Sequence, residues 1–306
     1  MIKYAIILLD RTSIAFCHAE NPYSERQLMD LNTLQNAIVW CMKENLRIQF
    51  VYPDYRLPQQ YYDVIDTIDH ADIKHLENSD VVVFNGLREL CDTKALSIVI
   101  RISKEELFEA YDRIVLFLKP HRHISIVITD IDKFTSEDFN KYQTFLSNLS
   151  LYAEKLTLEN KMPQISILTD RMALSSMNNC NAGDESITIA PNGKFYVCPA
   201  FYYDDENDSV GSLSDGLQIK NDQLYKLAYA PICRRCDAYH CRRCVWLNRK
   251  TTLEVNTPSH EQCVISHIER NCGRDLLNKI RKHGDFLPGT DIKEIDFLDP
   301  FDNLIK

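Results

Sequence analysis

The chain has 306 residues, of which 45% are hydrophobic and 26% are charged, and this composition is typical of a globular protein with a sizeable core. Its formal net charge of -9 argues against nucleic-acid binding through bulk electrostatics. Because no apolar run is long enough for a transmembrane helix, we also expect no membrane partner.

Residues 1–175 alternate apolar runs with helical patterns. The runs predicted to be strands are 4–9, 47–52, 80–85, 97–102, 124–131 and 164–168. Between them, residues 31–45 place apolar side chains on one helical face, and the helical segments that begin at Ser103 and Ser136 start with acidic residues. This alternation predicts an α/β domain with a largely parallel sheet, either a partial (β/α) barrel or an open sheet.

The start of the chain is interpreted as a first strand, because its apolar stretch is short and ends at Asp10. A cytoplasmic location follows, where disulfides rarely persist, so the 11 cysteines favour metal or redox chemistry. Only Gly86 precedes residue 182, and no glycine-rich phosphate loop is present. A Rossmann or P-loop nucleotide site is therefore not expected.

Residues 176–285 have a different character and are predicted to form a small cysteine-rich α+β domain. Residues 185–203 contain two β-rich runs joined at "PNG", which indicates a hairpin. Residues 221–230 are predicted to form a short helix and residues 259–282 a closing helix, and 286–306 is a tail with little periodicity. The predicted domains are thus 1–175 and 176–285, followed by the tail.

The run "CRRCDAYHCRRC", residues 233–244, contains two CxxC pairs, which are typical of metal ligation. The spacer between the pairs is only four residues, whereas zinc knuckles usually use a longer one. Compact spacings are also found around iron–sulfur clusters, and the neighbouring arginines 234, 235, 242 and 243 would favour thiolates. Spacing alone leaves both zinc and iron–sulfur open.

Cysteines outside this run extend the pattern. Cys180 is followed by twelve residues, Gly193, four residues and Cys198, and Cys263 follows Cys244 after eighteen residues. This order, CX12GX4C, then CX2CX4CX2C, then C, resembles the SPASM domain of radical SAM enzymes that modify peptides and proteins. The resemblance covers roughly residues 178–282, with spacers in the central run shorter than the family's usual ones.

The resemblance implies one or two [4Fe–4S] clusters. The first would be held by Cys180, Cys198 and Cys244, and the second by Cys233, Cys236, Cys241 and Cys263. The family's pattern has a further cysteine soon after the first, and none follows Cys180 here. That gap implies a non-cysteine ligand, an open iron, or no first cluster, while the short spacers keep zinc open at the second site.

The CxxxCxxC motif of radical SAM enzymes is missing. Cys17, Cys41 and Cys91 lie far apart, so residues 1–175 resemble a radical SAM domain without its SAM-cleaving site. Cys17 and His18 follow the first strand at the expected mouth of the barrel. We name no catalytic residue, and the sequence leaves open whether the chain catalyses a reaction alone.

The amino-acid sequence of residues 178–203, and that of the cysteine run through "EQCVISHIER", resembles CXXX repeat peptide maturases. This similarity implies a cytoplasmic iron–sulfur protein in the maturation of a ribosomally made cysteine-repeat peptide. It would bind a precursor peptide and anchor it at a cluster or transfer electrons, with a partner maturation enzyme or a reductase. The alternative is a non-catalytic, zinc-clipped module that binds a peptide or a partner.

Overall fold

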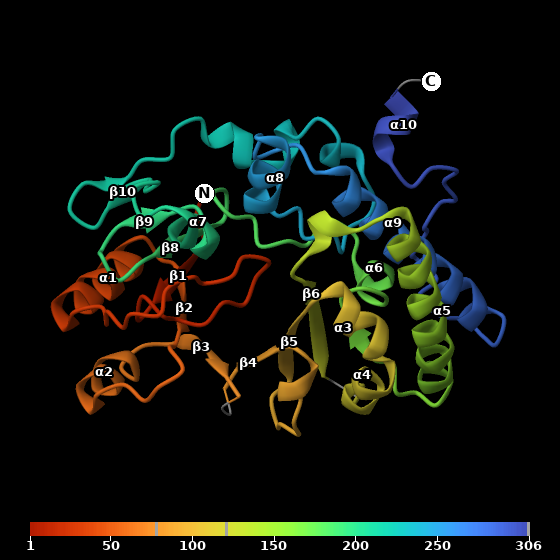
Figure 1. The fold of residues 1–306 in the computed structure, drawn as a ribbon, viewed down its shortest axis with the longest axis horizontal. Coiled ribbons are helices and arrows are strands. Elements are labelled where there is room, and N and C mark those ends of the chain that lie inside the picture. Colours follow the sequence, from red (N-terminus) through yellow and green to blue (C-terminus); the bar gives the residue numbers. More distant parts are fainter. Residues whose placement is uncertain (77–78, 120–121, 305–306) are drawn as a thin grey trace.

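A curved, mostly parallel sheet organises the chain in the computed structural model, which describes residues 1–76, 79–119 and 122–304. The strand order is β7-β6-β5-β4-β3-β2-β1-β8-β9, with every neighbouring pair parallel except the antiparallel β8 and β9. The strands are β1 (Tyr4–Leu8), β2 (Arg47–Val51), β3 (His70–His75), β4 (Val81–Asn85), β5 (Ser97–Ile102), β6 (His123–Ile128), β7 (Gln164–Ile165), β8 (Ser186–Ile189) and β9 (Phe195–Tyr196). In the described residues β7 and β9 remain at opposite edges, so the sheet forms an open trough and not a closed barrel (Figure 1).

Helices cover the outer face of this trough, as βα connections require. They are α1 (Leu31–Lys43), α2 (Gln59–Ile65), α3 (Lys104–Glu109), α4 (Tyr111–Phe117) and α5 (Ser136–Leu158), and they follow the outside of the curve in Figure 1. Asp30 caps α1 by accepting a hydrogen bond from the backbone N–H of Thr33, and Thr135 and Asp138 form a capping box at α5.

The parallel α/β prediction is confirmed, with informative differences. The predicted strands 4–9, 47–52, 80–85, 97–102 and 124–131 match β1, β2, β4, β5 and β6, but 164–168 yields only the two residues of β7. Strand β3 escaped prediction because its sequence, HADIKH, is polar and only Ile73 is buried. Its side chains pair with one another, since Asp72 contacts both His70 (3.4 Å) and Lys74 (2.9 Å).

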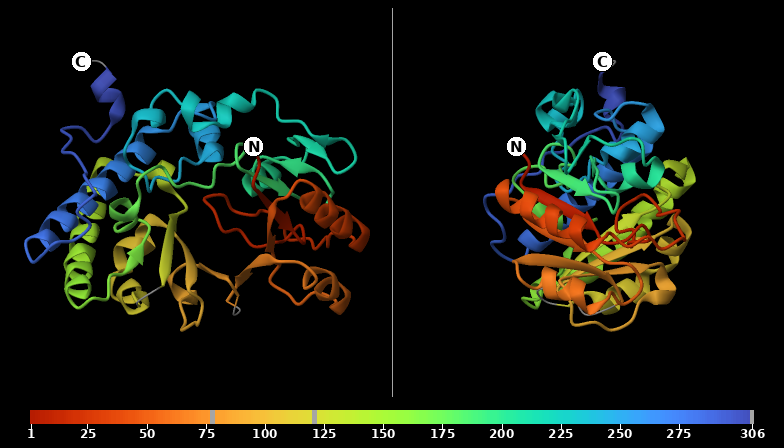
Figure 2. Two further views of the ribbon diagram at one scale, coloured as in Figure 1. Left: turned by 180° about the vertical axis from the view of Figure 1, so that it is seen from behind. Right: turned by 90° about the vertical axis from the view of Figure 1, so that its left-hand side faces the viewer.

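The cysteine-rich region lies across the open side of the trough (Figures 1 and 2). It begins within the sheet itself, because β8 pairs in parallel with β1, so the sheet continues past residue 175. After the predicted hairpin of β8 and β9 come α7 (Pro199–Asp204), β10 (Gly211–Ser212), β11 (Gly216–Leu217), α8 (Val245–Thr252), α9 (His260–Arg281) and α10 (Pro300–Leu304), while α6 (Asp170–Ala173) precedes it. The short helix predicted at 221–230 is a pair of 3₁₀ turns, Asp222–Tyr225 and Leu227–Tyr229.

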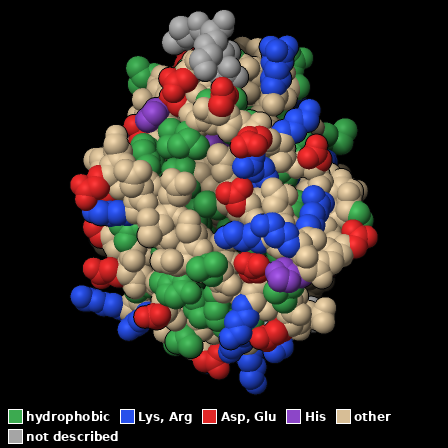
Figure 3. Space-filling view, turned by 90° about the vertical axis from the view of Figure 1, so that its right-hand side faces the viewer, with side chains coloured by type: hydrophobic (Ala, Val, Ile, Leu, Met, Phe, Trp, Pro, Cys, Tyr) green, Lys and Arg blue, Asp and Glu red, His purple; other side chains and the backbone are tan. Residues whose placement is uncertain are grey.

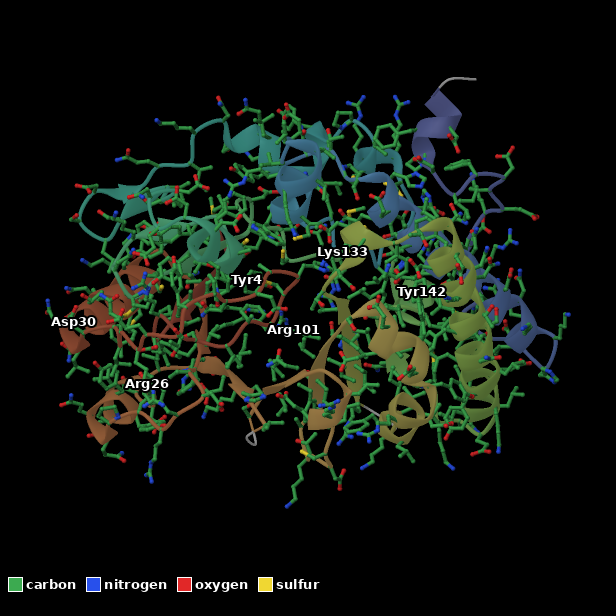
Figure 4. All side chains as sticks on the ribbon, in the orientation of Figure 1. Tyr4, Arg26, Asp30, Arg101, Lys133 and Tyr142 are labelled. Atoms are coloured by element: carbon green, nitrogen blue, oxygen red, sulfur yellow. The ribbon has the colours of Figure 1, made fainter. Side chains whose placement is uncertain are left out.

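Helix α9 joins this region to the helices of the trough. It packs along α5, where the Tyr142 hydroxyl donates a 2.5 Å hydrogen bond to Glu269, and Figure 4 shows Tyr142 between the two ribbons. The surface on the side of α5 and α9 carries acidic and basic side chains interspersed (Figure 3). Among the described residues, none of the helices combines the length and apolar character needed to cross a bilayer.

Candidate functional site

The cysteine run 233–244 folds into two tight turns whose backbone amides face sulfur. The Ala238 N–H donates to the Cys236 sulfur, and the Arg243 N–H donates to the Cys241 sulfur, each at 3.4 Å. Such N–H···S bonds favour a thiolate over a thiol. The four cysteines do not turn toward one centre, however, because Cys244 ends the run as the N-cap of α8 and accepts from the Leu247 N–H.

One group of thiols, the inner group, consists of Cys233, Cys236, Cys241 and Cys263. All four line one small cavity, and Cys263 reaches it from the first turn of α9. Burial raises the pKa of the Cys233 thiol to about 12 and that of Cys236 to about 11, and the neighbouring Cys241 thiol adds to both shifts. The structure thus brings together the four residues that the sequence assigned to a second cluster.

Two buried polar side chains face this cavity with unused hydrogen-bonding groups. Arg243 is 2% exposed and donates one hydrogen bond to the Tyr225 carbonyl at 2.8 Å. Its Nε and Nη2 are aligned with no acceptor, although the cation lies close enough to the Cys233 thiol to oppose the rise in its pKa. The Gln262 side-chain oxygen also lacks a hydrogen-bond partner. A buried guanidinium without an anion is costly. Its position beside four thiols therefore suits an anionic, thiolate-ligated group that would accept its hydrogen bonds.

A second group, the outer group, gathers Cys180, Cys198 and Cys244. Cys180 is exposed just before β8, where its carbonyl accepts from the Ser186 hydroxyl at 2.7 Å. Cys198 is the N-cap of α7. Burial raises the pKa of the Cys198 thiol, and the nearby Cys17, Cys244 and Cys180 raise it further, in that order. Cys198 is thus near Cys180, Cys244 and also Cys17, a cysteine that the sequence did not include in this group.

The arrangement within the groups bears on which metal they suit. Across residues 1–76, 79–119 and 122–304, no group of three or more His, Cys, Asp or Glu side chains is arranged to hold a metal ion. Zinc holds its thiolates about 2.3 Å from one point. A cubane iron–sulfur cluster attaches each thiolate to a different iron and keeps the sulfurs further apart.

The carboxyl ends of the strands form a separate, open cavity of about 410 Å³. Its walls come from the segment after β1 and from the ends of β4, β5 and β6. Arg101, which is 4% exposed, donates to the Asn85 side chain (2.6 Å) and to the carbonyls of Cys17 (2.9 Å) and Ala19 (3.1 Å). Figure 4 shows Arg101 inside the trough. This residue was not singled out from the sequence, although an arginine inside an apolar strand run was a usable signal.

A buried polar chain lies between the sheet and α9. The His18 ring donates from Nδ1 to the Ile128 carbonyl (2.9 Å), and burial lowers its pKa to about 4. His240 contacts Glu269 at 3.1 Å, and both side chains are buried. His18 and His240 line a common cavity with Cys241, so the strand-end segment and the inner group are close neighbours.

No family model matches this sequence, and no curated protein matches it. Solved structures do match. A histidine-tagged anSMEcpe with bound AdoMet has a TM-score of 0.61 at 12% sequence identity and covers 94% of this chain and 97% of that one. "Native anSMEcpe with bound AdoMet and Cp18Cys peptide" has a TM-score of 0.58 at 11% identity, with 92% and 100% covered. anSMEcpe is an anaerobic sulfatase-maturating enzyme with radical SAM and SPASM domains. The chain therefore has a radical SAM-like α/β fold, with a large and mostly parallel sheet that does not close.

Proposed function

We propose that this chain is an iron–sulfur protein of peptide maturation, which binds a cysteine-repeat precursor peptide at the mouth of its trough. Its outer and inner cysteine groups would each hold a [4Fe–4S] cluster. When bound, such clusters transfer single electrons, or hold a substrate donor where an iron lacks a protein ligand. A partner maturation enzyme or a reductase would supply or receive the electrons, since the chain has no CxxxCxxC motif.

One observation carries this proposal: the thiols partition into two spatially separate groups. Cys241 and Cys244 are three residues apart, yet the pKa of Cys263 responds to the thiols of Cys241, Cys233 and Cys236, and that of Cys244 responds to Cys180 and Cys17. A single zinc clip would have gathered Cys233 to Cys244 around one point. Two groups whose thiols influence different neighbours support two separate centres.

The side chains around the inner group support an anionic occupant. The unpartnered Nε and Nη2 of Arg243 would donate to sulfur, and His267 already lies 3.5 Å from the Cys236 sulfur through Nε2. The raised thiol pKa values mean that iron must displace protons on binding. Arg243 would offset part of the negative charge left on the thiolates.

The strand-end cavity is the proposed peptide site. Parallel α/β sheets bind ligands at the carboxyl ends of their strands, and this cavity is large and lined by polar groups, including the exposed carboxylate of Glu20. The matching structures include anSMEcpe with the Cp18Cys and with the Kp18Cys peptide. A peptide there would lie close to the segment that contains Cys17.

The decisive experiment is metal analysis of anaerobically purified and reconstituted protein. We expect about eight irons with matching acid-labile sulfide per chain, and a broad thiolate-to-iron absorption band. Zinc without iron would refute the proposal and favour the zinc-clipped binding module. Fluorescence anisotropy with a labelled cysteine-repeat peptide, compared with its all-serine analogue, then tests the substrate class.

Two neighbouring substitutions test the partition. Cys241→Ala should remove the inner cluster and Cys244→Ala the outer one, so each variant should retain about four irons with a different EPR signal after reduction. The exposed Cys91→Ala is the matched control and should keep both clusters. Loss of the same cluster from both variants would show that the run forms one site.

A further inference from the structure

The resemblance assigns three cysteines to the outer group, namely Cys180, Cys198 and Cys244. In the fold, a fourth cysteine, Cys17, lies near Cys198. Cys17 lies in the segment between β1 and α1, about 160 residues before Cys180 in the sequence. No spacing rule connects it with a C-terminal domain. Its backbone is nevertheless fixed at the mouth of the trough, because Arg101 donates to its carbonyl at 2.9 Å and to the Ala19 carbonyl at 3.1 Å.

Helix α7 holds the same segment from the other side. The Tyr203 hydroxyl lies 3.4 Å from the Ser13 carbonyl, and the Tyr23 hydroxyl donates to the Tyr202 carbonyl at 3.4 Å. The rings of Tyr23 and Tyr202 also contact each other, with centroids 5.6 Å apart. These contacts join the segment after β1 to α7, the short helix whose N-cap is Cys198.

Helix α8 completes the junction. The Trp246 indole N–H donates to Asp204 at the end of α7 (2.6 Å), and Arg249 lies over the Phe201 ring at 4.0 Å. These contacts join α8, which starts after Cys244, to α7. Cys17, Cys198 and Cys244 therefore come from three segments that pack against one another and border the same hydrophobic core, and Cys180 lies six residues before β8.

The thiols of this junction affect one another. Burial raises the pKa of Cys17, and the Cys180 thiol adds to the rise, while the cations Arg101 and Arg242 oppose it. Cys17 in turn is the neighbouring thiol with the greatest effect on the pKa of Cys198, and it also raises that of Cys244. The thiols that raise the pKa of Cys17 and of Cys198 are all members of the outer group or Cys17 itself, which agrees with the packing of their segments.

We infer that Cys17 is the fourth protein ligand of the outer centre, together with Cys180, Cys198 and Cys244. The inference rests on the proposed function, because it concerns how one of the two proposed clusters is held. Each thiol would lose its proton as its sulfur binds iron. A cysteine from the segment that follows the first strand would replace the missing cysteine after Cys180.

This assignment decides between two roles that the sequence left open. A cluster with four cysteine ligands has no free iron at which to hold a substrate thiol. The outer centre would then transfer electrons or stabilise the fold, and the exposed edge at Cys180 would be its contact with a redox partner. The segment after β1, which contains Cys17, also lines the strand-end cavity. The same segment would therefore contact a bound peptide and hold the cluster.

The test compares Cys17→Ala and Cys17→Ser with the control Cys91→Ala, using iron and sulfide content and EPR of the reduced, anaerobic proteins. Cys17→Ala should lose about four irons, or retain a three-iron signal, while the inner-group signal remains. Cys17→Ser should keep the cluster with shifted g values, because a serine oxygen can still bind iron. Cys91→Ala should match the wild type.

The outcomes separate this inference from the proposed function. Wild-type protein without iron would overturn both. Wild-type protein with two clusters, and Cys17→Ala with both clusters unaltered, would overturn the assignment of Cys17 alone.

If Cys17→Ala loses all iron through misfolding, metal-free wild-type protein can be treated with a short thiol-to-thiol cross-linker and mapped by mass spectrometry. Links from Cys17 to Cys180, Cys198 or Cys244 would support the assignment. Links from Cys17 to the inner group, or to none of these three, would refute it.

Discussion

The outer and inner groups contain the same kind of ligand but are built in opposite ways. The inner group takes three of its four thiols from nine consecutive residues, 233–241, and encloses them around a cavity with a buried arginine. The outer group collects Cys17, Cys180, Cys198 and Cys244 from segments spread over most of the chain. Short-range spacing can encode the first arrangement, whereas the second exists only once the sheet has formed and α7 has packed on it.

The inner group should depend most on Arg270. This buried side chain makes a two-point contact with Asp237, in the spacer between the CxxC pairs, through Nε (2.5 Å) and Nη2 (2.7 Å). Removing one partner of a buried pair costs about 3 kcal/mol. Arg270→Leu should therefore lower the stability of the region and deplete the inner cluster while sparing the outer EPR signal. Equal loss of both signals would contradict the independence of the groups.

Replacing Arg243 should stabilise the metal-free protein but make the cluster of the loaded protein harder to reduce. In metal-free protein, Arg243→Met removes a buried guanidinium with two unpartnered nitrogens, so the free energy of unfolding should rise by up to about 2 kcal/mol. In loaded protein the same change removes a cation beside the inner group, and the reduction potential of that cluster should fall. Electrochemical titration checks this, and an unchanged potential would show that Arg243 faces no cluster.

Acid should lower the free energy of unfolding by weakening the start of α5, the helix that packs along α9. Lys104 hydrogen-bonds Asp138 in the α5 capping box and lowers the pKa of that carboxyl to about 2. Because the folded-state pKa lies below the unfolded value of 3.8, this stabilisation is present above about pH 4 and is lost as the pH falls through 2. Solvent screening leaves about 1 kcal/mol. Asp138→Asn should remove that share of the acid dependence, measured by urea unfolding at pH 3 and pH 6.

The smallest effect should come from the junction of α7 and α8. Trp246→Phe keeps an aromatic ring but deletes the 2.6 Å hydrogen bond to Asp204, whose side chain is half exposed. We expect a loss of about 1 kcal/mol in the free energy of unfolding. The outer EPR signal should broaden while the inner one stays sharp. Broadening of the inner signal alone would contradict the placement of Cys244.

Much of the fold could be predicted because most of its strands bury side chains on both faces and are consequently apolar along their length. Strand β5, "SIVIRI", shows both the strength and the limit of that signal: its apolar run located the strand, but Arg101 within it was overlooked. Strand β3 was missed because its ladder partners β2 and β4, and not its own side chains, make it a strand. Backbone pairing of this kind leaves no trace in a local pattern.

Sequence alone determined the parallel α/β class, the hairpin at "PNG", and the set of seven cysteines with their expected division at Cys244. The fold class and the hairpin follow from local periodicity and turn residues, whereas the division of the cysteines is what the resemblance to SPASM domains implies. Only the tertiary structure brings Cys17 near Cys198, buries Arg243 with unpaired nitrogens while Arg234 and Arg235 are exposed, and leaves the described sheet open. The physical reason is that burial and thiol proximity depend on which distant segments pack together, and that choice belongs to the whole chain.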